Sequence, residues 1–350
     1  MGDILHGLPA ITALRKAHPS WGIDWLVEPR WRALLEADNA PERVDHRLST
    51  PQSNSPRPVV DHLYFAATKA WRKRERWRET LAEIRTLRSA LHEANYDAVL
   101  DLQGGIRSAI LGKMVAQHRL VGSATPREKG ASLLYTDTIF TRQPHVIEQA
   151  YELAEAIAGD ELEPTAPWLP WDEAAEDWAE ALFAQLDGPA VLINPGAGWG
   201  AKRWPIERYA VVAEELARQG MHILINTGPG EEALAEAITS RAAGRAHALN
   251  CTLAQLIATS RRIALAIAGD TGPLHLACAL GKPVVGIFGP TDPSRNGPYG
   301  SPFEVLRSPI SQRDHRRLHD PEAGLLTIEP EAVLHATHTL LYPDTVSKEL

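Results

Sequence analysis

The chain has 350 residues, a formal net charge of −8 and 44% hydrophobic residues. This length suits two domains of ordinary size, and no apolar run approaches the roughly 20 residues that span a bilayer, which argues against an integral membrane protein. The negative charge argues against general nucleic-acid binding, and Cys251 and Cys278 form neither a CxxC pair nor a metal-ligand pattern, so we expect buried free thiols.

The first residues, Gly2-Asp3-Ile4-Leu5-His6, read as a loop that leads into a helical pattern ending near Ala17, and they do not form a secretory signal. A doubly wound domain begins with a buried strand before its first functional loop, and no such strand precedes Gly2. We expect either that the start was assigned to an internal methionine or that this strand is lost. Asp3 suits a helix cap or a general base that acts on an acceptor hydroxyl, and His6 is the second candidate for that base.

The rest of the first half alternates strands and helices, which predicts a parallel sheet. Strands are expected at 22–27, 61–65, 96–104 and 120–122, and helices at 31–36, 69–93, 106–117 and 146–158. From Lys69 to Arg88 the chain carries eight basic residues against three glutamates. Such a run indicates either a solvated helix face or an acidic partner.

Pro164, Pro167 and Pro170 mark a linker, after which a second strand and helix series begins. It predicts strands at 190–194, 222–226, 263–268 and after Gly281, and helices at 206–219, 231–242, 253–258, 274–280 and 329–341. We therefore expect an N-terminal domain at 1–163, a C-terminal domain at 164–328, and a helix at 329–342 that packs back across the domains. Two doubly wound domains with a cleft between them fit this order.

The turn at Gly269-Asp270-Thr271-Gly272 ends an apolar run and precedes a helical pattern. Thr271 and Gly272 are therefore expected where a helix presents unpaired N–H groups, which attract phosphate. Asp270 suits sugar hydroxyls or capping, and His275 lies about one turn inside the helix, where it can reach the same anion.

A second loop, from Asn194 to Pro205, follows another buried strand and carries Gly196 and Lys202. Its glycines allow close backbone approach and Lys202 supplies a point charge, although a solvated basic loop is the alternative. Because both loops follow strands of one parallel sheet, they open on the same edge and together suit a diphosphate. Glu231 and Glu232 start a helix after a third strand, where they interact with the helix dipole or bind ribose hydroxyls.

Five motifs in this order resemble glycosyltransferase family 9, and the resemblance covers nearly the whole chain. They are Gly2-Asp3-Ile4-Leu5-His6 with Leu8-Pro9-Ala10, Tyr96-Asp97 with Asp101-Leu102-Gln103-Gly104, Lys202-Arg203-Trp204-Pro205, Gly269-Asp270-Thr271-Gly272 with His275-Leu276, and Gly289-Pro290-Thr291-Asp292-Pro293. Within the family the sequence is most similar to the lipopolysaccharide heptosyltransferases, especially the type that adds the first heptose. The resemblance implies a GT-B fold, in which two Rossmann-like doubly wound domains face a central cleft. The strand and small-residue loop that precede the Gly-Asp pair in the family are missing here.

The resemblance also implies an inverting transferase without a metal or other cofactor, which moves heptose from ADP-heptose to the Kdo region of the lipopolysaccharide inner core. By similarity, Asp3 is the general base, and Lys202 with the N–H groups of Thr271 and Gly272 stabilises the leaving ADP. His275 would support the same phosphates, and Asp270 with Glu231 or Glu232 would hold donor hydroxyls. Asn194 and Gly196 complete the implied donor site, and the implied acceptor site is formed by Asp3, His6, Arg72, Arg74, Gln103 and Arg127.

The implied setting is the cytoplasm, with a monomeric protein in peripheral contact with the inner membrane, where it meets the acidic lipid-linked saccharide Kdo-lipid A. Two alternatives are a family member with another nucleotide-sugar or acceptor, and a noncatalytic sugar-nucleotide-binding protein truncated near Asp3. A nicotinamide-dependent dehydrogenase is disfavoured, because no GxGxxG motif with a following acidic residue opens either half of the chain.

Overall fold

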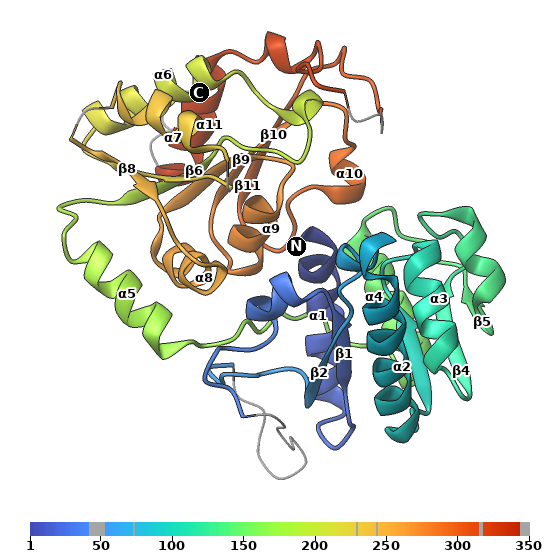
Figure 1. Ribbon diagram of the computed structural model, residues 1–350. Coiled ribbons are helices and arrows are strands. Elements are labelled where there is room, and N and C mark those ends of the chain that lie inside the picture. The colour runs from blue at the N-terminus through green and yellow to red at the C-terminus, as the bar shows by residue number, and fades with distance from the viewer. Residues whose placement is uncertain (42–52, 73, 229, 243, 315–317, 344–350) are drawn as a thin grey trace. The chain divides into compact units, whose positions relative to one another are not determined.

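The computed structural model describes residues 1–41, 53–72, 74–228, 230–242, 244–314 and 318–343, which form two compact units (Figure 1). Unit 1 runs from Asp3 to Trp171, and unit 2 begins at Asp172. This division falls within the proline-containing segment that starts at Pro164, after the predicted domain boundary at 163/164.

Unit 2 is built on one six-stranded parallel sheet. Its strands are β6 (Ala190–Asn194), β7 (His222–Asn226), β8 (Ala246–Leu249), β9 (Leu265–Gly269), β10 (Val284–Phe288) and β11 (Phe303–Arg307). They lie in the order β8-β7-β6-β9-β10-β11, which is the 3-2-1-4-5-6 order of dinucleotide-binding folds. The order reverses between β6 and β9, so the carboxyl ends of these two strands flank the place where such folds bind ligands.

Helices cover both faces of this sheet, which explains why β6, β9 and β10 are buried along their whole length. Figure 1 shows α6 (Ile206–Arg218), α7 (Glu232–Thr239) and α11 (Pro330–Leu341) on one side, and α8 (Leu253–Arg262) and α9 (Gly272–Ala279) on the other. Alternate strand residues such as Val191 and Ile193 share a core with Tyr209 of α6 and Val333 of α11. The rest of the unit includes α5 (Glu173–Phe183), which packs on α8, and the short α10 (Pro293–Asn296).

Unit 1 contains two separate parallel sheets instead of the single predicted sheet. One pairs β1 (Asp24–Val27) with β2 (His62–Phe65), and the other orders β3 (Ala98–Asp101), β4 (Arg119–Ser123) and β5 (Asp137–Ile139). In the 3-2-1-4-5-6 order, the pair β2-β1 corresponds to positions 3-2, and β3-β4-β5 corresponds to positions 4-5-6. No strand in the described ranges corresponds to position 1, which lies between them in that order. Residues of β1 and β3 are accordingly only partly buried, except for Val27 and Asp101.

Two helices of unit 1 begin at different residues from those predicted. The helix α1 (Gly2–Ala17) starts at once, so Asp3 lies in its first turn and not in a loop. The helix α2 (Trp77–Glu93) starts later, because residues 70–76 form two 3-10 turns, η2 (Ala70–Arg72) and η3 (Arg74–Arg76). Side chains of this segment bond to the helix that follows: Trp71 Nε1 donates to Glu83 at 2.7 Å, and Arg76 pairs with Glu79 at 2.5 Å. These contacts favour a compact turn over a continuation of the helix.

The remaining helices of unit 1 are α3 (Ile106–Val115) and α4 (Val146–Ala158), with 3-10 turns η1 (Pro29–Leu34) and η4 (Lys129–Leu134). In the parts of the chain that the structure describes, none of the helices is both long enough and apolar enough to cross a bilayer.

Candidate functional site

Predicted donor-site residues of unit 2 gather at the carboxyl edge of its sheet. Asn194 ends β6, Asp270 directly follows β9, and Lys202 comes from η5 (Gly200–Lys202), a 3-10 turn in the loop after β6. Because β6 and β9 are hydrogen-bonded neighbours, their loops meet where the strand order reverses.

Asp270 holds two basic side chains at this edge. Lys202 Nζ lies 2.5 Å from Asp270 Oδ2, and His275 Nε2 lies 3.1 Å from Asp270 Oδ1. The side chains of Asp270 and His275 are buried, and that of Lys202 is 14% exposed. Lys202 Nζ also lies 4.7 Å from the centre of the Trp199 ring, a cation–π contact. A lysine and a histidine are thus fixed by one carboxylate.

The carboxyl of Asp270 is kept ionised by these partners. Burial alone would raise its pKa, but the hydrogen bond and charge of His275, together with those of Lys202, outweigh burial and hold the pKa well below its ordinary value of 3.8. Both carboxylate oxygens are engaged by protein groups, so in the structure Asp270 holds Lys202 and His275 in place. Its predicted contact with a sugar hydroxyl stays a prediction.

The N-terminus of α9 faces the same edge. Its N-cap, Thr271, makes no side-chain cap bond and donates its hydroxyl to the Gly269 carbonyl at 3.2 Å. Pro273 occupies the first turn, where a missing N–H costs nothing. The backbone at Thr271 and Gly272 therefore presents the positive end of the helix dipole beside Lys202, as an anion requires.

Asn194 is a structural partner in this arrangement. Its amide Nδ2 donates to the Gly196 carbonyl at 2.9 Å and lies 3.4 Å from Thr271 Oγ1, while its Oδ1 accepts from Asn226 Nδ2 at 2.6 Å. Asn226 ends β7, and sequence reasoning missed it although its position after a strand of the same sheet was a usable signal. The two asparagines tie three strand ends together.

Gly196 and Glu231 also meet here. A Cβ at position 196 would lie 2.2 Å from Glu231 Oε2, so the Glu231 carboxylate would have to move if a larger residue replaced Gly196. Glu231 accepts from the Gly228 N–H at 3.0 Å and pairs with Arg203 at 2.9 Å, a residue that sequence reasoning did not select. Glu232 is exposed, and the backbone N–H groups of Glu232 and Gly230 lower the pKa of its carboxyl, so in the structure its side chain binds the backbone at the start of α7.

This edge of unit 2 can stabilise negative charge that grows on a phosphate oxygen. Lys202 provides an ammonium group held by Asp270, and His275 provides a ring nitrogen held by the same carboxylate. The start of α9 adds backbone N–H groups. All are held by protein contacts before any ligand binds, so little reorganisation is needed when charge develops.

Three predicted acceptor residues come together in unit 1. Gln103 Nε2 donates to Asp3 Oδ2 at 3.0 Å, and Arg127 Nη1 lies 3.4 Å from the same oxygen. The side chains of Asp3 and Arg127 are about half exposed, at 53% and 51%, so the carboxylate remains accessible. An amide and a guanidinium thus contact the same oxygen of Asp3.

Asp101 organises the loop that carries Gln103. Its Oδ1 accepts from the N–H groups of Gln103 and Gly104, at 2.9 and 3.1 Å, and its Oδ2 accepts from Ser108 and Tyr135. Burial and the neighbouring Asp101 charge raise the pKa of Tyr135 far above its ordinary value, so its hydroxyl stays a donor. This buried carboxylate was not selected as a site residue, yet it fixes the backbone of Gln103, one of the predicted acceptor residues.

The other predicted acceptor residues are placed differently. His6 is buried in α1 and packs edge to face with His145, 6.4 Å between ring centres. Arg72 is exposed in η2, and none of the described contacts joins it to Asp3. Arg74 lies in η3, and its side chain lies outside the described part of the structure.

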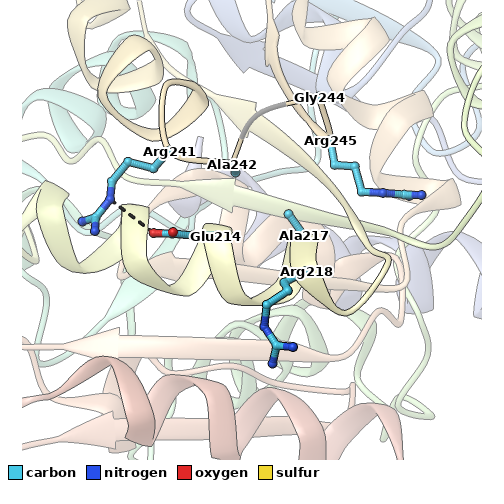
Figure 2. Close-up of a pocket in the computed structure, with 7 residues that line it drawn as sticks. All are labelled: Glu214, Ala217, Arg218, Arg241, Ala242, Gly244 and Arg245. Carbon is cyan, nitrogen blue, oxygen red and sulfur yellow. Dashed lines mark ion pairs between the residues drawn. The ribbon is translucent and has the colours of Figure 1, made fainter.

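No group of three or more His, Cys, Asp or Glu side chains with metal-binding geometry occurs in the ranges that the structure describes. A pocket on unit 2 also lies away from the predicted site, at the amino ends of β7 and β8 (Figure 2). Its arginines are paired with carboxylates, and the side chains of Arg218 and Arg245 point away from one another. They do not converge on one ligand.

Comparison with known proteins gives a consistent result over most of the chain. Residues 84–325 match the model of glycosyltransferase family 9 (heptosyltransferase). The chain is 32% identical over 348 residues to lipopolysaccharide heptosyltransferase 1 of Escherichia coli strain K12, with 97% of each chain covered.

Solved structures give the same result. The chain is similar to the E. coli heptosyltransferase WaaC with ADP, with a TM-score of 0.75, 27% identity and 97% of both chains covered. It is also similar to WaaC with ADP-2-deoxy-2-fluoro heptose, with a TM-score of 0.70, 26% identity and coverage of 100% of this chain and 97% of the other. The fold is GT-B, as the sequence predicts.

Proposed function

Since the chain belongs to glycosyltransferase family 9 and is a glycosyltransferase, we propose that it transfers heptose from ADP-heptose to the inner core of a lipopolysaccharide. The similarity to a lipopolysaccharide heptosyltransferase 1 supports the sugar and the acceptor class. The similarity to a heptosyltransferase solved with a fluorinated ADP-heptose supports the nucleotide.

The observation that carries the proposal is the Lys202–Asp270–His275 cluster at the strand-order reversal of unit 2. When the bond from the anomeric carbon to the β-phosphate breaks, its electron pair stays on the departing ADP. Lys202 and the N–H groups at the start of α9 offset that added charge. Glu231 and Asp270 are the proposed partners of donor hydroxyls, and Asn194 and Gly196 shape the surrounding backbone.

Asp3 is the proposed general base. It takes the proton from an acceptor hydroxyl as that oxygen bonds to the anomeric carbon on the face opposite the leaving ADP, so the configuration inverts. Gln103 and Arg127, which contact Asp3, orient it and bind an acidic Kdo residue of the acceptor.

No resident metal takes part in the proposed reaction, because Lys202 and the N-terminus of α9 supply the positive charge that a metal would otherwise bring to a diphosphate. We further propose that the protein is a monomer in the cytoplasm, in peripheral contact with the inner membrane that carries the lipid-linked acceptor. The excess of basic residues between Lys69 and Arg88 supports an acidic partner.

The test is transfer from ADP-heptose to a Kdo-bearing lipid A acceptor, followed by mass spectrometry of the product, with and without EDTA. We expect a mass increase of one heptose, insensitive to EDTA, and loss of turnover in Asp3→Asn. Thermal shifts with a panel of nucleotide-sugars provide the check on the donor. A shift with a uridine or guanosine diphosphate sugar but none with ADP-heptose would overturn the proposed donor.

A further inference from the structure

The helix α2 is unusually exposed for its length. Of its 17 residues only Leu91 is buried, while Trp77 and Leu81 are 56% and 44% exposed. The C-terminal end of α2 is fixed to α3 by His92, whose Nε2 lies 3.0 Å from the Met114 carbonyl oxygen. The N-terminal end therefore presents large apolar side chains to solvent.

Charges on α2 are segregated around the helix axis. At about 100° per residue, Trp77, Arg78, Leu81, Arg85 and Arg88 lie within one sector roughly 100° wide, and all five are exposed. We call these five residues the Trp–Arg strip. The Arg78 guanidinium lies 5.2 Å from the centre of the Trp77 ring.

The carboxylates lie outside this sector. Glu79 and Glu83 are on another side of the helix, where they are already bonded to Arg76 and to the indole of Trp71. The Trp–Arg strip therefore combines three guanidinium groups and two large apolar side chains with no acidic residue. This concentration of positive charge occurs in a chain whose net charge is −8.

Such a combination is typical of helices that lie in the interface of an anionic membrane. Arginines bind phosphate groups with paired hydrogen bonds, while tryptophan and leucine enter the boundary between headgroups and acyl chains. A soluble saccharide would use the guanidinium groups but would leave Leu81 without a partner. Charge complementarity and the exposed apolar side chains together favour a lipid surface.

We propose that the Trp–Arg strip of α2 docks unit 1 on the surface of a bilayer that contains anionic phospholipids. This inference rests on the proposed function, which puts the lipid-linked acceptor in a bilayer and the protein in peripheral contact with it, and it assigns that contact to a surface. Docking concentrates the enzyme on its acceptor and takes no part in the chemistry at Asp3 or Lys202.

The experiment measures cosedimentation of the full chain with vesicles of phosphatidylcholine mixed with phosphatidylglycerol, and with vesicles of phosphatidylcholine alone. We expect binding only to the anionic vesicles, weakened by added salt. Arg85→Glu with Arg88→Glu should weaken binding by at least roughly twentyfold, at about fivefold per removed positive charge. Trp77→Ser with Leu81→Ser should weaken binding to the anionic vesicles as well, because it removes the two apolar side chains that enter the bilayer.

Matched controls come from unit 2. Arg218→Glu with Arg241→Glu makes the same change in net charge at exposed arginines (Figure 2), and Ile310→Ser with Leu326→Ser removes two exposed apolar side chains. These variants should bind anionic vesicles like the unmodified chain. Equal loss of binding in strip and control variants, or unchanged binding in the strip variants, would overturn the proposal.

A second readout separates the membrane from the saccharide. For a deacylated, water-soluble acceptor, the strip variants should keep the unmodified KM and kcat, whereas transfer to acceptor embedded in anionic vesicles should fall. A rise in KM for the soluble acceptor that matches the loss of vesicle binding would overturn the proposal and assign the strip to saccharide binding. Failure of transfer in the unmodified chain would contradict the proposed function, while vesicle binding would still test the strip.

Discussion

Within unit 2, Lys202 is the side chain from which the largest effect on turnover is expected. Its ammonium group is held by Asp270 and by the face of Trp199, close to the start of α9. Replacing Lys202 by Met should lower kcat by about 10²- to 10³-fold, the usual effect of removing one group that stabilises developing negative charge.

Steady-state kinetics with ADP-heptose as the varied substrate provide the measurement, and Lys202→Arg is the control. The arginine variant keeps the charge and should retain more activity than the methionine variant, although it cannot reproduce the point contact to Asp270. Equal kcat in the unmodified and methionine chains would rule out this role.

Asp270 should make the stability of unit 2 sensitive to acid. Because its pKa is lowered in the folded chain, its contribution to the free energy of unfolding is complete above the ordinary value of 3.8 and is lost as pH falls toward the folded pKa. Urea unfolding of unit 2 between pH 5 and pH 3 should therefore show a steeper loss of stability in the unmodified chain than in Asp270→Asn. If the free energy of unfolding fell equally in the two chains between pH 5 and pH 3, Asp270 would not be the group that makes unit 2 sensitive to acid.

At the scale of the elements, the loop between β6 and α6 has no room for a side chain at Gly200. A Cβ at this position would lie 1.5 Å from the backbone oxygen of His319, and that backbone cannot move as a flexible side chain can. Gly200→Ala should destabilise unit 2 by about 1–3 kcal/mol and raise the KM for ADP-heptose, because η5 carries Lys202.

The same loop offers its own control for that prediction. No heavy atom outside the immediate neighbours lies within 4 Å of a Cβ built at Gly198, so Gly198→Ala should leave stability almost unchanged. Urea unfolding and donor kinetics on both variants check the pair, and a larger effect at Gly198 would show that the His319 contact does not hold the loop.

The elements also show where sequence patterns are informative. Central strands β6, β9 and β10 are buried on both faces, so their continuous apolar runs predict them. The strands that were not predicted, β5, β8 and β11, all lie at sheet edges and include partly exposed residues. An edge strand is defined by pairing on one side, and this pairing leaves little trace in composition.

At the scale of the whole molecule, the two units differ in how completely their sheets are buried. Unit 2 has one continuous sheet covered on both faces, whereas β1 and β3 of unit 1 each have an unpaired edge in the described structure. We expect two transitions in differential scanning calorimetry. ADP should raise the transition temperature of unit 2 alone, because at 100 times its Kd it adds about 2.7 kcal/mol to the free energy of unfolding of the unit that binds it.

Gly200→Ala identifies the transition of unit 2, since its clash lies entirely within that unit. If ADP shifts the transition that this substitution leaves unchanged, the donor site does not lie at the carboxyl edge of β6 and β9. A single transition would show that the two units unfold together.

The class of fold, the positions of the buried central strands along the chain, the glycine turns and the family could all be predicted from the sequence. These features depend on local periodicity and on short motifs such as Gly269-Asp270-Thr271-Gly272, which neighbouring residues specify. The contacts of each polar side chain, by contrast, became known from the folded structure. Asp270 lies 68 residues from Lys202 in the chain, and Asn194 lies 32 residues from Asn226. Such contacts are fixed by strand order and register, which bring distant loops to one edge of the sheet.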